Sequence, residues 1–260
     1  MYYYFVAVYL VSLFLVTSAV FLPVAVILRF TTFWFDRRLA ILHAFTCFWA
    51  SCYSWLSPLW KFVITGRENV DRKKAYVIAC NHQSFLDILI IFRIFLHFKW
   101  VAKSSLFRFP IIGWNMWLNR HIKIERSSTK SQRKMLKQCA NAIQNGSSLL
   151  IFPEGTRSRR GELRKFKEGA FLIALQQKTD IVPMVIDDSY KALPEDGIMP
   201  RNKQKVFLNI LPPVPYETFK DMEVRQVSEH IHSIIAAELE RMRIETHLRN
   251  CFANDNSIDF

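Results

Sequence analysis

The chain has 260 residues, enough to bury one ordinary hydrophobic core, and nothing in its composition requires a second independent domain. Lys and Arg outnumber Asp and Glu by 35 to 22, and the formal charge of +13 indicates an anionic partner. The first 28 residues carry no charged side chain, which excludes nucleic acid as that partner. An anionic membrane surface remains as the candidate partner.

Residues 1–28 form a continuous apolar stretch that ends at Arg29. As a tilted helix rising about 1.5 Å per residue, the stretch is long enough for a hydrocarbon core of roughly 30 Å. A cleaved signal peptide is the alternative, but no basic residue precedes the apolar stretch and no clear small-residue cleavage site follows it. We therefore expect this segment to be embedded in a membrane.

A second apolar stretch, Leu39–Trp60, is rich in aromatic residues, which favour the membrane interface. Together the two stretches predict a membrane-embedded helical hairpin over residues 1–60. It either crosses the bilayer twice or dips into one leaflet. Four basic residues flank the stretches and favour a cytoplasmic, anionic surface: Arg29, Arg37, Arg38 and Lys61.

Beyond Lys61 the pattern changes to short apolar runs separated by amphipathic stretches. The runs predict buried strands: Tyr76–Cys80, Trp100–Ala102, Ile122–Ile124, Ser148–Phe152, Ile181–Ile186 and Val206–Leu211. Apolar residues at helical spacing predict helices over 129–145 and 224–239. We expect a single α/β domain over residues 61–248, with a largely buried sheet flanked by helices. Residues 249–260 show no periodicity, so we expect a loose tail.

The first candidate site is the segment NHQSFLD, residues 81–87, directly after a predicted strand. Near neutral pH, His82 can take a proton from a hydroxyl group, and Asp87 can hold the other ring nitrogen. On a continuous helix the two residues would point about 140° apart, so His82 is expected in the turn before the helix. The alternative is structural, with Ser84 as a helix cap and Asp87 as a capping-box acid.

The second candidate site is FPEGTRS, residues 152–158, which follows another buried strand and precedes a basic loop. A glycine-bearing turn can offer backbone N–H groups to a phosphate, and Arg157 can bind two phosphate oxygens. Glu154 can accept a hydrogen bond from a hydroxyl group or orient Arg157. A plain strand-exit turn with a solvated loop is the alternative.

The order NHQSFLD, FPEGTRS and the buried IVPMVI strand resembles the 1-acylglycerol-3-phosphate O-acyltransferase family of glycerolipid synthesis. The resemblance covers residues 63–211. It implies that His82 and Asp87 form the catalytic pair and that Glu154, Gly155 and Arg157 bind the glycerol phosphate of the acceptor.

Three further assignments follow from this resemblance. Gly113 and the run ending in Arg126 look like the family's second block, from which only Arg126 is carried over because Glu125 replaces an aspartate that is frequent there. Lys103 resembles a basic residue of the phosphate site. Val182 and Pro183 correspond to a block assigned to the acyl-donor or acyl-chain pocket.

The resemblance implies an acyltransferase that moves a fatty acyl group from a thioester to the free hydroxyl of 1-acylglycerol-3-phosphate, giving phosphatidic acid. The mechanism needs no metal and no cofactor, and the acyl donor is acyl-coenzyme A or acyl carrier protein. The expected partners are a lysophospholipid and an anionic phospholipid membrane, with no nucleic acid. The expected location is the cytoplasmic face of a membrane, such as the bacterial inner membrane.

Two alternatives stay open at this point. The motifs identify the reaction better than the headgroup, so the acceptor could be another lysophospholipid or an ornithine-type lipid. The chain could also be a membrane-anchored lipid-binding protein with a vestigial site, although both motifs are intact.

Overall fold

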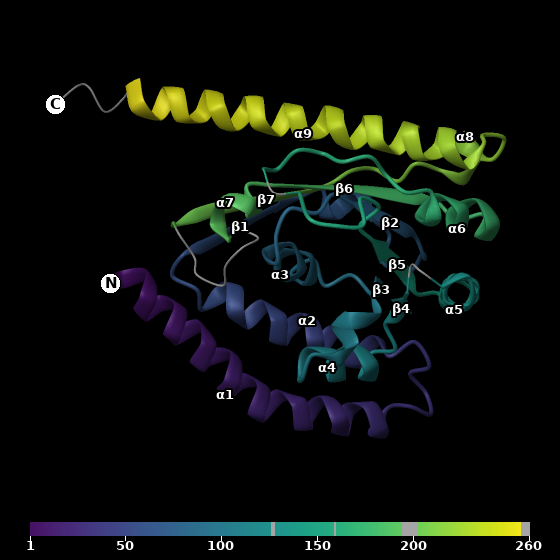
Figure 1. The fold of residues 1–260 in the computed structure, drawn as a ribbon, viewed down its shortest axis with the longest axis horizontal. Coiled ribbons are helices and arrows are strands. Elements are labelled where there is room, and N and C mark those ends of the chain that lie inside the picture. Colours follow the sequence, from purple (N-terminus) through teal and green to yellow (C-terminus); the bar gives the residue numbers. More distant parts are fainter. Residues whose placement is uncertain (126–127, 159, 194–201, 256–260) are drawn as a thin grey trace.

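The computed structural model describes residues 1–125, 128–158, 160–193 and 202–255. At its centre is a seven-stranded sheet of order β1-β7-β6-β2-β5-β3-β4 (Figure 1). The strands are β1 (Trp60–Thr65), β2 (Val77–Cys80), β3 (Phe98–Lys103), β4 (Ile122–Ile124), β5 (Ser148–Ile151), β6 (Ile181–Asp187) and β7 (Gln204–Ile210).

Five neighbouring strands run parallel, from β6 through β2, β5 and β3 to β4. Strand β7 pairs antiparallel with β6 and parallel with β1. The carboxyl ends of the five parallel strands therefore meet at one edge, which is where open α/β sheets bind ligands. The predicted α/β class is confirmed, and the six predicted strands correspond to β2 through β7. Strand β1 was missed because it begins at Trp60, inside the second apolar stretch.

Helices cover both faces of the sheet (Figure 1). They are α1 (Tyr2–Thr31), α2 (Ala40–Trp55), α3 (Leu86–Phe92), α4 (Ile112–Leu118), α5 (Thr129–Gln144), α6 (Gly169–Gln177), α7 (Ser189–Ala192), α8 (Tyr216–Phe219) and α9 (Val224–Asp255), with short 3-10 helices η1 (Arg67–Asn69) and η2 (Ser104–Arg108). Helices α5, α6 and α9 cover one face, and α2 and α3 cover the other. Helix α9 runs to Asp255, into the segment expected to be loose.

Alternation along the strands divides the core between the two faces. Ile78 and Val182 belong to the cluster beneath α2 and α3, whereas their neighbours Val77 and Ile181 belong to the cluster beneath α5, α6 and α9. Successive side chains of a strand point to opposite faces, so a strand buried on both sides reads as a continuous apolar run. This explains why the inner strands were visible in the sequence.

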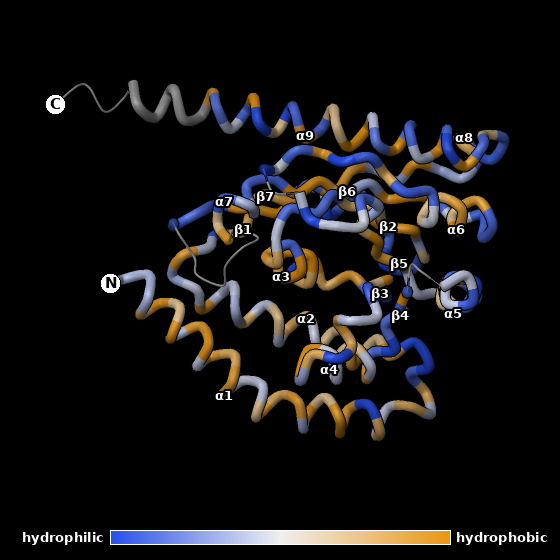
Figure 2. The backbone as a smooth tube through the Cα atoms, viewed as in Figure 1, coloured by the Kyte–Doolittle hydropathy of each residue, from blue (hydrophilic) through white to orange (hydrophobic). Residues whose placement is uncertain are grey.

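Helix α1 is the one candidate membrane span among the residues that the structure describes, by length and composition. Its residues are mostly apolar (Figure 2), and its most apolar window has a mean hydropathy of 2.6. Only 11% of that window is buried. A soluble helix with this composition would bury most of its side chains. Helix α1 is therefore suited to lie in a membrane.

Helix α2 forms the second arm of the expected hairpin, but it packs on the α/β domain (Figure 1). Cys47 and Ala50 belong to the core cluster that includes α3. His43 is buried, and its Nε2 lies 3.0 Å from the Leu96 carbonyl oxygen. The packing thus attaches α2 to the domain, although it precedes residue 60.

We expect deletion of residues 1–31 to release the protein from membranes without unfolding it, because α1 buries only Val6, Ser18 and Ala25. Deletion of residues 1–60 also removes Cys47 and Ala50 from the core, and we expect that protein to unfold. Carbonate-wash fractionation and circular dichroism measure the two effects. If the protein that lacks residues 1–31 stayed in the membrane pellet, α1 would not be the main anchor.

Candidate active site

The two sequence motifs lie together at the carboxyl edge of the sheet. The first follows β2 and the second follows β5, which are parallel neighbours. The backbone N–H of Ser158 donates to the His82 carbonyl oxygen at 2.8 Å, so the second motif folds back onto the first. The structure therefore combines the two motifs in one candidate site.

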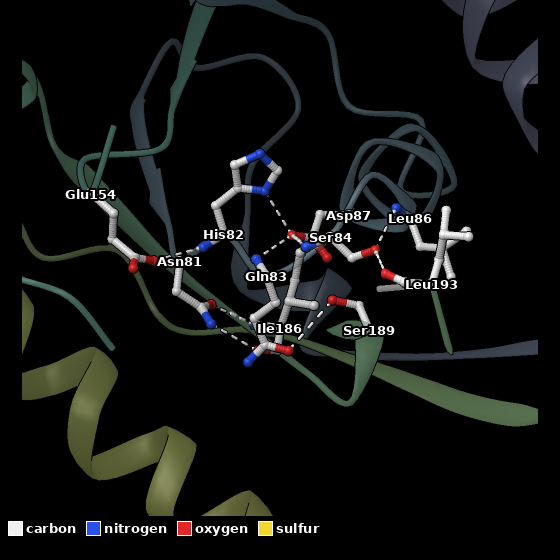
Figure 3. A network of polar contacts seen from close by, with 10 residues as sticks. All are labelled: Asn81, His82, Gln83, Ser84, Leu86, Asp87, Glu154, Ile186, Ser189 and Leu193. Atoms are coloured by element: carbon white, nitrogen blue, oxygen red, sulfur yellow. Dashed lines mark hydrogen bonds and ion pairs between the residues drawn. The ribbon is translucent and has the colours of Figure 1, made fainter. Parts of the chain in front are cut away.

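His82 lies in the turn before α3, which begins at Leu86, as the spacing of the motif predicts. Its Nδ1 lies 2.7 Å from Asp87 Oδ2 (Figure 3). The Asp87 side chain is fully buried, whereas 16% of the His82 side chain is exposed. Because Nδ1 faces the carboxylate, Nε2 is the ring nitrogen that can exchange a proton with a ligand.

Asp87 also holds the backbone of this turn. Its Oδ2 accepts the N–H groups of Gln83 at 2.6 Å and Ser84 at 2.9 Å. The N-cap residue is Phe85 rather than the expected Ser84, while the bond from the Ser84 N–H to Asp87 is the one expected of a capping-box acid. A single carboxylate oxygen thus fixes the turn that carries His82 and contacts the imidazole.

Phe152 stacks on the His82 ring, a contact that sequence reasoning did not assign. The ring centroids are 3.9 Å apart and the ring planes differ by 8°. The carboxylate and the stacked ring together restrict both rotations of the imidazole. Stacking on an electron-rich ring face also stabilises the protonated imidazole.

Asn81 was likewise left unassigned, and it anchors the other side of the turn (Figure 3). Its Nδ2 donates to the Ile186 carbonyl oxygen at 2.8 Å, and its Oδ1 accepts the Ile186 N–H at 2.7 Å. Through these two bonds the Asn81 side chain continues the hydrogen bonding between β2 and β6 beyond the last paired residues of the two strands. An asparagine at a strand end was the only signal of this role.

Glu154 faces the backbone of the first motif. Its Oε1 accepts the His82 N–H at 2.7 Å, and its Oε2 accepts the Arg164 N–H at 3.1 Å. Burial raises the pKa of the Glu154 carboxyl to about 7, against the lowering effect of these two N–H groups. In this geometry Glu154 connects the two motif loops, while its predicted contact with an acceptor stays a prediction.

The raised pKa of Glu154 predicts how stability depends on pH. Between about pH 4.5 and about pH 7 the folded protein holds a proton on Glu154 that the unfolded chain releases. Protonated Glu154 therefore contributes fully to the free energy of unfolding below about pH 4.5, and this contribution is lost as the pH rises to about 7. We expect the unfolding temperature of the wild type to fall relative to that of Glu154→Gln across this range. Glu162→Gln, at an exposed position in the same loop, is the control, and equal pH profiles for the wild type and Glu154→Gln would contradict the shift.

Gly155 and Arg157 continue the second motif. Gly155 has a φ of 75°, in the left-handed region that favours glycine, and its N–H donates to the Phe152 carbonyl oxygen at 3.0 Å. The Cζ atom of Arg157 lies 4.2 Å from the centroid of the Phe85 ring. This cation–π contact holds the guanidinium beside the first motif.

The other basic site residues differ in their placement. Lys103 is exposed at the carboxyl end of β3, on the same edge as the two motifs. Arg126 lies outside the described residues. Their predicted contacts with a phosphate stay predictions.

The two residues assigned to an acyl pocket lie near the start of β6. Val182 is fully buried in the core cluster beneath α2 and α3, and Pro183 is also buried. They pair with Ile78 and Ala79 of β2. The structure therefore places them in the sheet interior, and a role in binding an acyl chain stays a prediction.

Among the described residues, no group of three or more His, Cys, Asp or Glu side chains is arranged to hold a metal ion. The chemical groups gathered at the sheet edge are instead an imidazole, a buried carboxylate and basic side chains.

The fold and the site define an α/β protein with a histidine–carboxylate pair at the carboxyl edge of its sheet. Residues 61–187 match the family model described as Acyltransferase. This segment of the chain belongs to that family.

Two curated relatives are named as 1-acyl-sn-glycerol-3-phosphate acyltransferases. A 1-acyl-sn-glycerol-3-phosphate acyltransferase of Chlamydomonas reinhardtii is 40% identical over 181 residues, which are 68% of this chain and 54% of the relative. A chloroplastic protein of that name from Arabidopsis thaliana is 35% identical over 199 residues, 74% of this chain and 55% of the relative. The chain thus spans about half the length of these relatives.

The fold is also similar to a solved structure. The crystal structure of the 1-acyl-sn-glycerophosphate acyltransferase PlsC of Thermotoga maritima superposes with a TM-score of 0.75 at 20% identity. The match covers 92% of this chain and 95% of that one. The likeness therefore extends beyond the residues of the family model to the terminal helices.

Proposed function

We propose that this protein transfers a fatty acyl group from an acyl thioester to the free hydroxyl of 1-acylglycerol-3-phosphate, giving phosphatidic acid for phospholipid synthesis. The observation that carries the proposal is the His82–Asp87 contact of 2.7 Å at the ligand-binding edge of the sheet. The names of the relatives support the choice of acceptor.

In the proposed reaction, His82 Nε2 takes the proton of the acceptor hydroxyl while its oxygen attacks the thioester carbonyl carbon. Asp87 keeps the proton on Nδ1 and stabilises the imidazolium that forms. Collapse of the intermediate breaks the carbon–sulfur bond, and the imidazolium returns the proton to the departing thiolate. The chain's own side chains supply each proton transfer, and the acceptor hydroxyl is the nucleophile.

We propose that Arg157 binds the acceptor phosphate at the same edge, where Lys103 also lies, and that Arg126 contributes a further positive charge to this binding. Basic groups attract an anionic headgroup, and a guanidinium can bind two phosphate oxygens. Phe85 holds the guanidinium of Arg157 in place. This arrangement would present the glycerol hydroxyl to His82.

We expect Arg157→Ala to raise KM for lysophosphatidic acid by roughly 10- to 150-fold, since a charge-assisted hydrogen bond contributes about 1.5 to 3 kcal/mol. The same variant should also show a smaller preference for lysophosphatidic acid over monoacylglycerol, which lacks the phosphate. Arg133→Ala, at an exposed position on α5, is the control. An unchanged KM in Arg157→Ala would contradict the phosphate role.

We propose that α1 holds the protein at the cytoplasmic face of a membrane, which in a bacterium is the inner membrane. The apolar, exposed surface of α1 and the basic residues Arg29, Arg37 and Arg38 support this location. Both the lysophospholipid and its product are membrane lipids, so an anchored enzyme meets its acceptor in the bilayer. Acyl-coenzyme A and acyl carrier protein are the two candidate donors.

The test is an assay of the purified protein in mixed micelles. Lysophosphatidic acid, lysophosphatidylcholine, monoacylglycerol and an ornithine lipid are each combined with acyl-coenzyme A and with acyl-acyl carrier protein. We expect diacyl product mainly from lysophosphatidic acid. Acylation of another acceptor at a higher kcat/KM would overturn the acceptor, and no product with any pair would overturn the activity.

A further inference from the structure

The loop that carries Arg157, residues 153–168, is closed at its base. The N–H of Lys167 donates to the Pro153 carbonyl oxygen at 2.9 Å. Glu154 and Ser158 attach the same base to the backbone of His82 at 2.7 and 2.8 Å. The base of the loop is therefore fixed relative to the imidazole by groups of the two motifs themselves.

The far side of the loop, at Gly161, is held by a residue outside both motifs. Arg243 of helix α9 donates from Nη2 to the Gly161 carbonyl oxygen at 2.6 Å. Gly161 has a φ of 74°, and a Cβ atom there would lie 2.5 Å from the Tyr190 ring and 3.0 Å from Arg243 Nη2. The loop thus fits closely between α9 and α7.

The same guanidinium contacts the end of strand β6. Its Nε lies 3.3 Å from Asp187 Oδ2, and its Nη2 lies 3.3 Å from Asp187 Oδ1. Asp187 is only 3% exposed, so this guanidinium faces a buried carboxylate. Asp187 Oδ1 also accepts from Gln83 Nε2 at 3.3 Å, and Gln83 follows His82 in the turn.

We propose that Arg243 is a positioning residue that fixes the loop 153–168, and with it Arg157, relative to His82. This inference rests on the proposed function, in which Arg157 binds the acceptor phosphate. Arg243 connects three elements that are distant in the sequence: helix α9, the end of β6 and the basic loop. The family model ends at Asp187, so α9 lies outside it.

The proposal predicts a separation of binding from chemistry. Without Arg243 the Gly161 carbonyl loses its donor, and the far side of the loop is released. The His82–Asp87 contact and the bonds at the base of the loop do not involve Arg243. Acceptor binding should therefore weaken while the chemical step is retained.

The experiment compares Arg243→Met, Arg243→Lys and the matched control Arg241→Met in the full-length protein. Arg241 lies on the same helix, and its ion pairs are with Glu238 and Glu245 of α9 itself. We expect Arg243→Met to raise KM for lysophosphatidic acid about tenfold with kcat within about twofold, as for loss of a charge-assisted hydrogen bond. Arg243→Lys should restore part of the loss, and Arg241→Met should match the wild type.

Hydrogen exchange of residues 153–168 is the second readout, and it does not depend on activity. We expect faster exchange in Arg243→Met than in Arg241→Met. Unchanged exchange, or a fall in kcat with unchanged KM, would overturn the positioning role. If the wild type shows no acyl transfer, the proposed function fails while hydrogen exchange still decides the inference. If Arg243→Met does not fold because Asp187 is left unpaired, the double variant Asp187→Asn/Arg243→Met removes that charge and the same comparison applies.

Discussion

Replacement of His82 with alanine is expected to lower kcat for acyl transfer by about 10² to 10⁴, the usual effect of losing a positioned general base. His82 is the residue whose ring lies against Asp87 and stacks on Phe152. No other side chain of the 81–87 motif offers a basic nitrogen at the same place. The measurement is kcat with lysophosphatidic acid at a saturating acyl donor concentration.

The control for this variant is His230→Ala, which removes a histidine from α9 on the far face of the sheet. It should retain wild-type turnover. Thermal unfolding in detergent shows whether each variant is folded. A folded His82→Ala protein with near wild-type turnover would contradict the proposed mechanism.

Replacement of Asp87 with asparagine is expected to lower kcat at least about 10²-fold while leaving the fold intact. An amide oxygen at the position of Oδ2 can still accept the N–H groups of Gln83 and Ser84, so the turn is retained. The amide carries no charge, and it stabilises the imidazolium of His82 far less than a carboxylate does.

This variant separates the two roles of Asp87. If the carboxylate only fixes the turn, asparagine should cost less than about 1 kcal/mol in stability and nothing in rate, because its amide oxygen can accept the same N–H groups. Asp87→Ala is the second variant, since it removes the turn contacts as well and should destabilise the protein. Full activity in Asp87→Asn would leave Asp87 with a structural role alone.

Much of the sheet could be predicted because its inner strands are buried on both faces. Runs such as Ile181–Ile186 are apolar without interruption, and a parallel sheet covered by helices produces this pattern. Residues 81–87 and 152–158 were also visible, since each follows a strand and combines titratable groups with a turn. The position of His82 before α3 followed from helix geometry alone.

The remaining features depend on contacts between distant parts of the chain. Helix α2 has an apolar composition that suits a membrane, and its packing on α3 could not be read from the sequence. Phe152 was visible as an apolar residue, but its stacking on His82 requires the parallel pairing of β2 with β5. Arg243 is one of many basic residues, and nothing in its local sequence distinguishes it from Arg241.

The most direct test of the proposed function follows a labelled acyl chain from an acyl thioester to lysophosphatidic acid, with the product identified by mass spectrometry. The wild type should form labelled phosphatidic acid and release one free thiol for each acyl group transferred. His82→Ala, folded to the same extent, should form it at least about 10²-fold more slowly. Equal rates for the two proteins, or no labelled phosphatidic acid from the wild type with either acyl-coenzyme A or acyl-acyl carrier protein, would contradict the account.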